Sequence, residues 1–437
     1  MFLNRERELS QLENDFLKPT SSFLLLFGRR KVGKTSLLKE YVKNKEVLYF
    51  SCVELLPKIL FEKFSSIIAD TFNQKLSPSH NFVDFLDSID QCEIKDKTVI
   101  ILDDFQNLSK IEKEALQNFY RLWNKKLRYK KIQFILSSCV CSSLPEDKKI
   151  YDKSDAKLTL KSLEFKSIKA IIKDVSKDDL MCIYALFGTN INYLKQYDTQ
   201  KDFMRNVEEI FFNTKSEIFN DGIHLIKNEL SEIVTYSSIL YAIALGNNKI
   251  GDIALCLGVK SSYLTRYIQK LLDLMIISKI TPINDDPHHS KFGRYEIEDN
   301  YLKFWFGYVY PNLSLINKGE VDFTANLLQT DFIEHMVVPV YKNYIYDLLI
   351  QNPENFLSYT PLKIGRWWNN KNKEIDIVAY NSSHITFMEC KWKSKESIAE
   401  SYTLLKEKAN LFNTVLNKNY LIFPKIEEKS NRTDDGK

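Results

Sequence analysis

The most constraining feature of this chain is a glycine-lysine motif that directly follows a short apolar run. Residues 28–35 read Gly-Arg-Arg-Lys-Val-Gly-Lys-Thr, which fits the pattern G-x-x-x-x-G-K-[ST]. The apolar run 23–27 precedes the motif and the helix-like segment 36–41 follows it, which is the order that a phosphate-binding loop requires. Only 12 of the 437 residues are glycine, so a chance match is improbable. The sequence therefore predicts a nucleotide-binding site.

Each residue type in this loop has a physical task. The glycines let backbone N–H groups close around phosphates, and the helix N-terminus adds a partial positive charge. We expect Lys34 to reach the β- and γ-phosphates of ATP and Thr35 to offer its hydroxyl to Mg²⁺. The alternative is an ordinary glycine-containing turn between a strand and a helix. The residues predicted to bind ATP are Gly28, Arg29, Arg30, Lys31, Val32, Gly33, Lys34, Thr35 and Ser36.

A second apolar run, 99–102, ends in two acidic residues, Asp103 and Asp104. A strand that ends in an acid is typical of the magnesium side of a P-loop site, and we assign Asp103 to Mg²⁺. Asp104 is then expected to polarise the attacking water as a catalytic residue. Asp is one methylene shorter than the usual Glu, which predicts slow hydrolysis. The alternative for Asp104 is a second solvated acid at the end of a strand.

The apolar pattern also predicts the domain organisation. Short β-like runs at 23–27, 47–50, 99–102 and 133–137 alternate with helical ones, which indicates an α/β fold with a parallel sheet. Later segments read first as helices alone and then as three helices followed by a β-hairpin, the outline of a winged helix-turn-helix. The predicted parts are a P-loop ATPase core (1–160), a helical lid (161–230), a winged helix-turn-helix (231–311), an α/β nuclease-like domain (312–425) and a polar tail (426–437).

Composition and charge limit which binding partners and which cellular compartment we expect for this protein. The chain has 61 basic and 57 acidic residues, so its formal charge of +4 permits contact with nucleic acid but does not require it. No apolar run approaches the roughly 18 residues of a membrane span, and no signal-peptide core is evident at the start. The seven cysteines form no C-x-x-C pair. We expect a cytoplasmic protein with reduced thiols and no membrane partner.

With these features, the chain resembles a family of archaeal and bacterial AAA/STAND-type ATPases whose C-terminal domain is related to PD-(D/E)xK nucleases. The resemblance covers almost the whole chain and implies an ATP site with Mg²⁺, an N-terminal element near the adenine and possible homo-oligomers. Besides the P-loop, it rests on Asp-Asp-Phe-Gln at 103–106, where the family has Asp-Glu-Phe-Gln, and on segments 2–9, 236–246, 293–295, 304–306 and 364–368.

Two further departures from the family pattern affect hydrolysis. Ile191 stands where the lid motif of the family has proline, and residues 151–153 read Tyr-Asp-Lys instead of a Tyr-Gly-Arg-like element. No arginine is therefore available there to neutralise charge on the transferred phosphate. Together with Asp104, these positions predict a slow switch or a domain that binds ATP without turnover.

The second helix of the predicted helix-turn-helix spans 261–274, and its apolar residues form one buried stripe. The outward-facing residues are of types that contact phosphates and base edges. We therefore expect DNA as a partner, with RNA not excluded. The alternative is a lid or an oligomer contact, because Asp252 and Asp273 dilute the basic face. The residues predicted to contact DNA are Thr265, Arg266, Gln269 and Lys270.

Two strand-like runs near the C-terminus carry a D…E-x-K pattern. Side chains alternate along a strand, so a hairpin brings Glu374 and Asp376 towards Glu389 and Lys391. We predict that Asp376 and Glu389 bind Mg²⁺ and that Lys391 orients or deprotonates the attacking water. The alternative is a solvated charged face.

The resemblance adds Glu334 as an auxiliary metal-binding acid of a nuclease. The functional hypothesis is an ATPase that controls a Mg²⁺-dependent nuclease-like domain acting on nucleic acid. The alternative is an ATP-switched DNA-binding or scaffold protein without nuclease activity.

Overall fold

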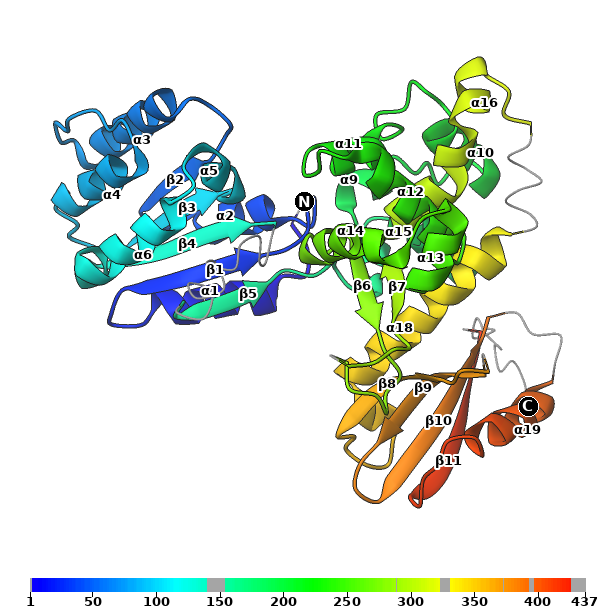
Figure 1. Cartoon of the computed structure of the whole chain (residues 1–437). Coiled ribbons are helices and arrows are strands. Elements are labelled where there is room, and N and C mark those ends of the chain that lie inside the picture. Colours follow the sequence, from blue (N-terminus) through cyan, green and yellow to red (C-terminus); the bar gives the residue numbers. More distant parts are fainter. Residues whose placement is uncertain are drawn as a thin grey trace, which may run out of the picture. The chain divides into compact units, whose positions relative to one another are not determined.

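The computed structural model of the chain describes residues 2–139, 154–287, 289–322, 331–371, 373–392 and 397–425. These residues form two compact units, one of Met1–Leu163 with Asp273–Ile276 and one of Glu164–Leu272 with Ile277–Lys437. We call them unit 1 and unit 2; their elements are labelled in Figure 1. Within the described ranges, no helix has both the length and the apolar character needed to span a membrane.

Unit 1 contains a five-stranded sheet in the order β2-β3-β4-β1-β5, and all neighbouring strands are parallel. The α/β fold with a parallel sheet is thereby confirmed. Four of the strands coincide with the apolar runs of the sequence, whereas β5 was not predicted, because its alternating polar residues give a weak strand signal. The strands are β1 (Ser22–Phe27), β2 (Val47–Ser51), β3 (Thr98–Asp103), β4 (Ile132–Ser138) and β5 (Ala156–Thr159).

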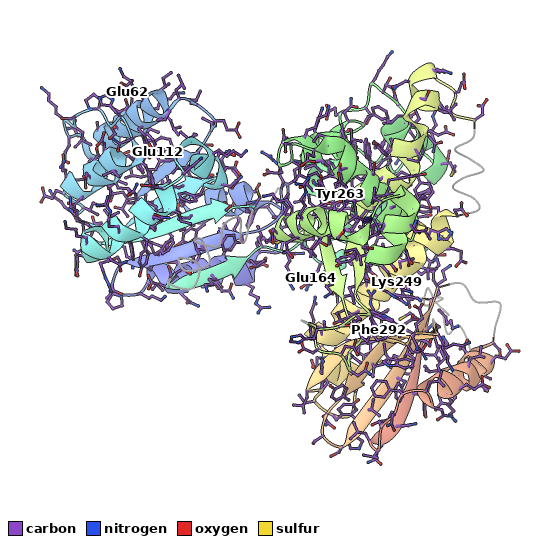
Figure 2. All side chains as sticks on the ribbon, viewed as in Figure 1. Glu62, Glu112, Glu164, Lys249, Tyr263 and Phe292 are labelled. Atoms are coloured by element: carbon purple, nitrogen blue, oxygen red, sulfur yellow. The ribbon has the colours of Figure 1, made fainter. Side chains whose placement is uncertain are left out.

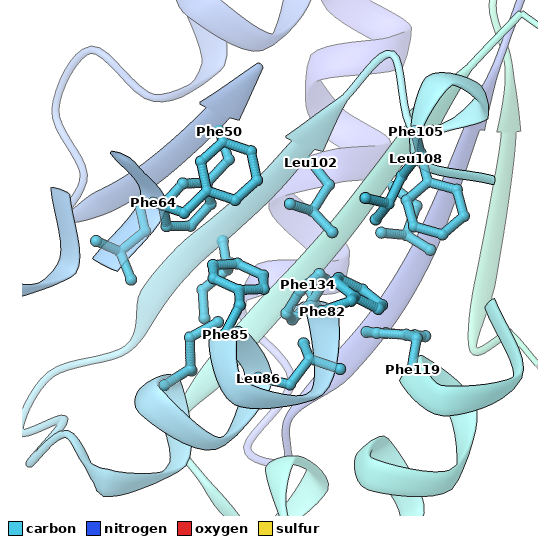
Figure 3. Packing of buried hydrophobic residues seen from close by; sticks show 14 of the residues in the cluster. Phe50, Phe64, Phe82, Phe85, Leu86, Leu102, Phe105, Leu108, Phe119 and Phe134 are labelled. Carbon is cyan, nitrogen blue, oxygen red and sulfur yellow. The ribbon is translucent and has the colours of Figure 1, made fainter. Parts of the chain in front are cut away.

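The sheet of unit 1 separates two apolar clusters. Alternate residues of β1 face opposite sides, so Phe23 packs in one cluster and Leu24 in the other. The first cluster is rich in phenylalanine and lies under α3, α4 and α6 (Figure 3). The second lies under α1 and α2. The helices of unit 1 are α1 (Glu6–Phe16), α2 (Lys34–Tyr41), α3 (Pro57–Phe72), α4 (Phe82–Gln91), α5 (Gln106–Ile111) and α6 (Ala115–Lys125), with the 3₁₀ turn η1 (Leu127–Tyr129).

The first half of unit 2 is helical. Its core is aromatic, and the Trp305 ring occupies the space where a side chain at Gly222 would lie, since a Cβ there would come within 2.2 Å of the ring. The helices before the hairpin are η2 (Phe165–Ala170), α8 (Lys177–Phe187), α9 (Ile191–Leu194), α10 (Phe203–Phe211), α11 (Asp221–Lys227), α12 (Ile233–Ala244), α13 (Ile250–Leu257) and α14 (Ser261–Asp273). The hairpin consists of β6 (Ile277–Ile280) and β7 (Arg294–Ile297), and α15 (Asn300–Phe304), η3 (Trp305–Val309), η4 (Tyr310–Asn312) and α16 (Leu313–Lys318) follow it.

The second half of unit 2 is a four-stranded sheet in the order β11-β10-β9-β8. The β8–β9 and β9–β10 pairs are antiparallel, and β10–β11 is parallel because α19 connects those two strands. The elements are η5 (Ile333–Val337), α18 (Val338–Gln351), η6 (Pro353–Asn355), β8 (Lys363–Trp368), β9 (Glu374–Tyr380), β10 (His384–Lys391), α19 (Ile398–Ala409) and β11 (Asn417–Pro424).

The β6–β7 hairpin joins the two halves of unit 2. The N–H of Ile283 donates to the Arg366 carbonyl at 2.7 Å. Two ion pairs reinforce this contact, Arg294 with Glu374 at 2.9 Å and Arg366 with Glu296 at 2.8 Å. The hairpin is therefore packed against β8 through both hydrogen bonds and charge.

Candidate functional site

The loop between β1 and α2 has two positions whose surroundings or backbone favour glycine. A Cβ on Gly28 would lie 2.8 Å from the Leu160 carbonyl oxygen and from Val32 Cγ1. Gly33 has φ +102°, in the region that favours glycine, and Lys31 has φ +63°. The two glycines of the motif are thus required by the shape of the loop itself.

Lys34 is the first residue of α2 and is 7% exposed. Its ammonium group donates to the carbonyl of Gly28 at 2.7 Å and to that of Arg29 at 3.2 Å, so its side chain spans the loop. The helix N-terminus directs its unpaired N–H groups to the same place. An ammonium group and backbone donors around one loop form a site suited to phosphate.

Asp103 is a buried carboxylate at the end of β3. Its Oδ2 accepts a hydrogen bond from Thr35 Oγ1 at 2.7 Å and another from the Tyr49 hydroxyl at 2.6 Å. The structure therefore brings Thr35 and Asp103 together. Burial and the charge of Asp103 raise the pKa of Tyr49, which keeps the phenol neutral and able to donate. Hydroxyl and carboxylate oxygens are the donors that Mg²⁺ prefers, so this pair fits the metal.

Asp104 lies directly beside this pair in a left-handed conformation, with φ +56°. Its Oδ1 accepts a hydrogen bond from the side-chain amide of Gln106 at 3.1 Å, and the side-chain Oε1 of Gln106 accepts one from the N–H of Cys139 at 3.3 Å. Gln106 thus connects the carboxyl ends of β3 and β4. Among the described residues, the buried Ser137 hydroxyl at the end of β4 has no hydrogen-bond partner. The role assigned to Asp104 in hydrolysis stays a prediction.

Arg5 is a structural residue of the loop that the sequence analysis did not single out. It is only 6% exposed, and its guanidinium donates to the Val32 carbonyl at 3.2 Å and to the Lys161 carbonyl at 2.8 Å. Glu8 provides the counter-charge at 2.8 Å. Arg5 therefore ties the N-terminal segment to the phosphate-binding loop. Segment 2–9 entered the family resemblance as a whole, and no local pattern distinguishes Arg5 from the charged residues beside it.

The two other departures from the family pattern have different outcomes. Ile191 is the first residue of α9, and the side chain of Asn190 caps this helix. Proline is favoured at such a first helical position, so isoleucine there is compatible with the helix but does not restrict its backbone as proline does. Residues 151–153 lie outside the described part of the chain.

Helix α14 presents the predicted DNA-contact residues unevenly. Thr265, Arg266 and Gln269 are exposed, while Lys270 is half-buried. The Arg266 guanidinium lies 4.6 Å from the centre of the Tyr267 ring and 3.4 Å from a carboxylate oxygen of Glu232. An acid and an aromatic ring therefore hold the main cation of this face. Figure 2 labels Tyr263 on the same helix.

The two acids of the C-terminal pattern are buried and paired with lysines. Asp376 is 8% exposed, its Oδ1 lies 2.6 Å from the Lys342 ammonium, and its Oδ2 accepts the N–H of Cys390 at 2.9 Å. Glu389 is 6% exposed and lies 2.7 Å from the ammonium group of Lys408. Lys342 comes from α18 and Lys408 from α19, so both helices contribute to the site. We call these four residues the acid–lysine cluster.

The charges in the acid–lysine cluster influence one another. Burial raises the pKa of Glu389, the negative charge of Asp376 raises it further, and Lys408 opposes both. Burial works to lower the pKa of Lys342, but the charge of Asp376 outweighs it and the pKa is raised. Two carboxylates and two ammonium groups thus form a nearly neutral cluster.

The remaining predicted residues of this region lie in different surroundings. Glu374 is drawn to Arg294; burial works to raise its pKa, but this ion pair and the nearby lysines lower it. Lys391, at the end of β10, is half-buried. Glu334 is exposed and stands eight residues before Lys342, about 12 Å along a helix. In the described ranges no three acidic, histidine or cysteine residues are grouped to hold a metal, so the expected convergence of three acids is not found.

Comparison with known proteins places this geometry in context. Residues 2–197 match a family model described as an ATPase domain predominantly from Archaea, and residues 305–402 match one described as archaeal and bacterial proteins of unknown function. An uncharacterized protein of Methanocaldococcus jannaschii is 31% identical over 443 residues, which covers 99% of this chain and 97% of that protein. An uncharacterized ATP-binding protein of the same organism is 43% identical over 47 residues, 11% of this chain and 80% of its own length.

A solved structure shares the fold. The Walker-type ATPase of Pyrococcus abyssi aligns with a TM-score of 0.51 at 19% sequence identity and covers 70% of this chain and 96% of that chain. The parallel sheet, the phosphate-binding loop and the matched family model define unit 1 as an ATP-binding P-loop ATPase domain. The chain as a whole belongs to the archaeal P-loop ATPase family that includes the uncharacterized Methanocaldococcus protein.

Proposed function

We propose that the chain is an ATP-controlled protein of the AAA/STAND type whose C-terminal part hydrolyses phosphodiester bonds of nucleic acid at a PD-(D/E)xK nuclease-like site. One observation carries this proposal. Two buried carboxylates on neighbouring strands, Asp376 and Glu389, are accompanied by Lys342 and Lys408 from flanking helices. Burial of charged groups costs desolvation free energy, so a buried cluster of this kind suggests a functional role. Acids beside lysines are also the residue types that phosphodiester hydrolysis uses.

The chemistry of these groups supports the assignment. The carboxylate oxygens of Asp376 and Glu389 are hard donors that would hold Mg²⁺, and the ion would supply positive charge to the scissile phosphate. Lys391 orients or deprotonates the attacking water. Lys342 and Lys408 neutralise the acids before substrate binds and donate to phosphate oxygens afterwards. Glu374 is paired with Arg294, so we assign it no direct role in binding Mg²⁺.

In unit 1, the ATP-binding residues are those of the loop, with Lys34 on the phosphates and Thr35 and Asp103 on Mg²⁺. Asp104 polarises the attacking water, and its short side chain makes turnover slow. ATP binding then serves as a switch for the C-terminal site.

Helices α12, α13 and α14 with the β6–β7 hairpin are proposed to form a winged helix-turn-helix. Its contact with DNA runs through Thr265, Arg266 and Gln269 on the exposed face of α14. The hairpin packs against β8, so the wing is occupied by a protein contact and DNA binding depends on α14. This arrangement favours weak, sequence-independent DNA contact.

A second function is favoured by the same ion pairs. Because each acid already has a lysine partner at 2.7 Å or less, the site is complete without a metal. In this alternative, the chain is an ATP-switched protein that binds nucleic acid or acts as a scaffold and does not cleave.

The experiment that separates these functions is a cleavage assay. The purified full chain is incubated with labelled single- and double-stranded DNA and RNA in Mg²⁺ and in Mn²⁺. Cleavage is expected in the wild type and is expected to be lost in Asp376→Asn and Lys391→Ala. Lys418→Ala, at the other end of the sheet beside Ile385, is the matched control and should cleave normally. Binding without cleavage in every condition would favour the alternative.

A further inference from the structure

A cavity of about 300 Å³ opens in unit 2, at the lower end of the range of small-molecule sites. It lies where the loop between β6 and β7, the end of β8 and the segment after α19 meet. Phe292, labelled in Figure 2, belongs to its wall. The lining residues are Asn284, Asp285, Phe292, Trp367, Trp368, Asn369, Asn370, Leu411, Phe412 and Asn413.

Aromatic rings form the rigid part of this wall. Trp367 and Trp368 are 4% and 5% exposed, and Trp367 packs edge-on against Phe412 with ring centres 5.7 Å apart. The indole N–H of Trp368 donates to the Phe292 carbonyl at 3.0 Å, which fixes the loop against the sheet. Residue Phe292 is 42% exposed. It is therefore available to stack on a planar ligand.

Carboxamides form the polar part of the wall. Asn284, Asn370 and Asn413 are exposed, and their side chains make no hydrogen bond to any residue that the structure describes. Each offers both a donor and an acceptor. Asn369 is different, because its carbonyl accepts the N–H groups of Lys371 and Lys373.

Charge excludes a phosphate as the occupant of this cavity. Among its described lining residues none is a lysine or arginine, and the one charged residue is Asp285, whose carboxylate accepts the Ser290 hydroxyl at 2.6 Å. A phosphate would meet repulsion there. A neutral planar heterocycle could stack on the exposed ring of Phe292, and its edge could form hydrogen bonds with the side-chain amides of the three exposed asparagines.

The cavity and the acid–lysine cluster lie on the same four-stranded sheet. Trp368 in its wall is paired in register with Glu374, and Glu374 stands two residues from Asp376, about 7 Å along the strand. We propose that the cavity holds one nucleobase of a single-stranded nucleic acid whose backbone lies on the acid–lysine cluster. This inference rests on the proposed function and specifies its substrate as a strand with an unpaired base.

The test measures binding of two labelled single strands to the full chain by fluorescence anisotropy. One strand carries bases and the other has an abasic position at its centre. The wild type is expected to prefer the strand with bases. Phe292→Ala should weaken binding of that strand about tenfold, the usual size of one lost base stack, and leave the abasic strand unchanged. The double variant Asn370→Ala/Asn413→Ala should lose discrimination between A, C, G and T at the central position.

Asn355→Ala is the matched control, because Asn355 is exposed on η6 away from the lining residues. Equal binding of both strands by the wild type, or unchanged binding in both variants, would overturn the base site and leave the proposed function standing. No binding of either strand would overturn both. A deoxynucleoside monophosphate serves as competitor, and tighter binding of it than of the strand would overturn the proposal in favour of a free-nucleotide site.

Discussion

The carboxylates of the two candidate sites have different kinds of partner. In unit 1, Asp103 is held by the neutral hydroxyls of Thr35 and Tyr49, which leave its negative charge in place. In unit 2, Asp376 and Glu389 are each paired with the ammonium group of a lysine. The first arrangement keeps a carboxylate ready for a cation, whereas in the second a cation must compete with an ammonium group already present. The first site is therefore suited to binding Mg²⁺ together with ATP without rearrangement. The second site could bind a cation only after the lysine–carboxylate pairs separate.

The largest expected effect is a loss of ATP affinity at the site in unit 1. Lys34→Ala should lower ATP affinity about 100-fold, because charge-assisted hydrogen bonds to phosphate worth about 3 kcal/mol are lost. Lys39→Ala on the same helix is exposed and should bind ATP as the wild type does. Titration calorimetry measures both. Equal ATP affinity in Lys34→Ala and the wild type would refute the site assignment.

The next effect tests whether the acid–lysine cluster is a coupled structure. Lys342→Met should lower the free energy of unfolding of unit 2 by about 2 kcal/mol, because it leaves the buried Asp376 without its partner. Adding Asp376→Asn should restore part of the loss. Urea unfolding followed by tryptophan fluorescence reports on unit 2, which contains four of the five tryptophans.

The control for Lys342→Met is an exposed ion pair. Lys201 pairs with Glu209 at 2.6 Å on the surface, and Lys201→Met should lower the free energy of unfolding much less than Lys342→Met does. If Lys342→Met and Lys201→Met lowered the free energy of unfolding equally, burial would add nothing to the stability that the Lys342–Asp376 pair contributes.

A smaller effect concerns the hydroxyl that holds Asp103. Tyr49→Phe should lower the free energy of unfolding of unit 1 by about 1 kcal/mol, the usual net value of one hydrogen bond. ATP binding without Mg²⁺ should be unchanged, because the Tyr49 hydroxyl donates to Asp103, the carboxylate assigned to Mg²⁺. Thermal unfolding and calorimetry measure the two quantities. A large loss of Mg²⁺-free ATP binding would assign Tyr49 to the nucleotide itself.

The smallest expected effect is a change in the ATP turnover rate, which tests why turnover should be slow. Asp104→Glu should raise the ATP turnover rate about threefold, since the longer carboxylate reaches further while the left-handed backbone opposes the larger residue. Phosphate release measures the rate. No rise in rate would show that the length of Asp104 does not limit hydrolysis.

The sequence indicated the phosphate-binding loop and Asp103 because each is marked by a local pattern, and the structure brings Thr35 and Asp103 together. The loop and Asp103 each follow a strongly apolar strand, and parallel strands bring their carboxyl ends to one edge. Tyr49 was missed because its contact depends on β2 lying beside β3, and strand order is a tertiary property. Arg5 was missed because its partners stand 27 and 156 residues away.

The C-terminal site was predicted only in part for the same physical reason. Period-two alternation placed Asp376 and Glu389 on neighbouring strands, but it could not indicate which helix faces them. Lys342 is the one basic residue of α18 and Lys408 is one of two lysines in α19, and only packing shows that they face the two acids. Glu374 was grouped with Asp376 by its spacing, yet Arg294 from a distant hairpin pairs with it.

The most direct test of ATP control is the rate of nucleic-acid cleavage as a function of ATP concentration, measured in the wild type and in Lys34→Ala. If unit 1 controls the acid–lysine cluster, ATP changes the wild-type rate and leaves the rate of Lys34→Ala unaltered. Cleavage that responds identically to ATP in both proteins, or is independent of ATP in both, would contradict the account.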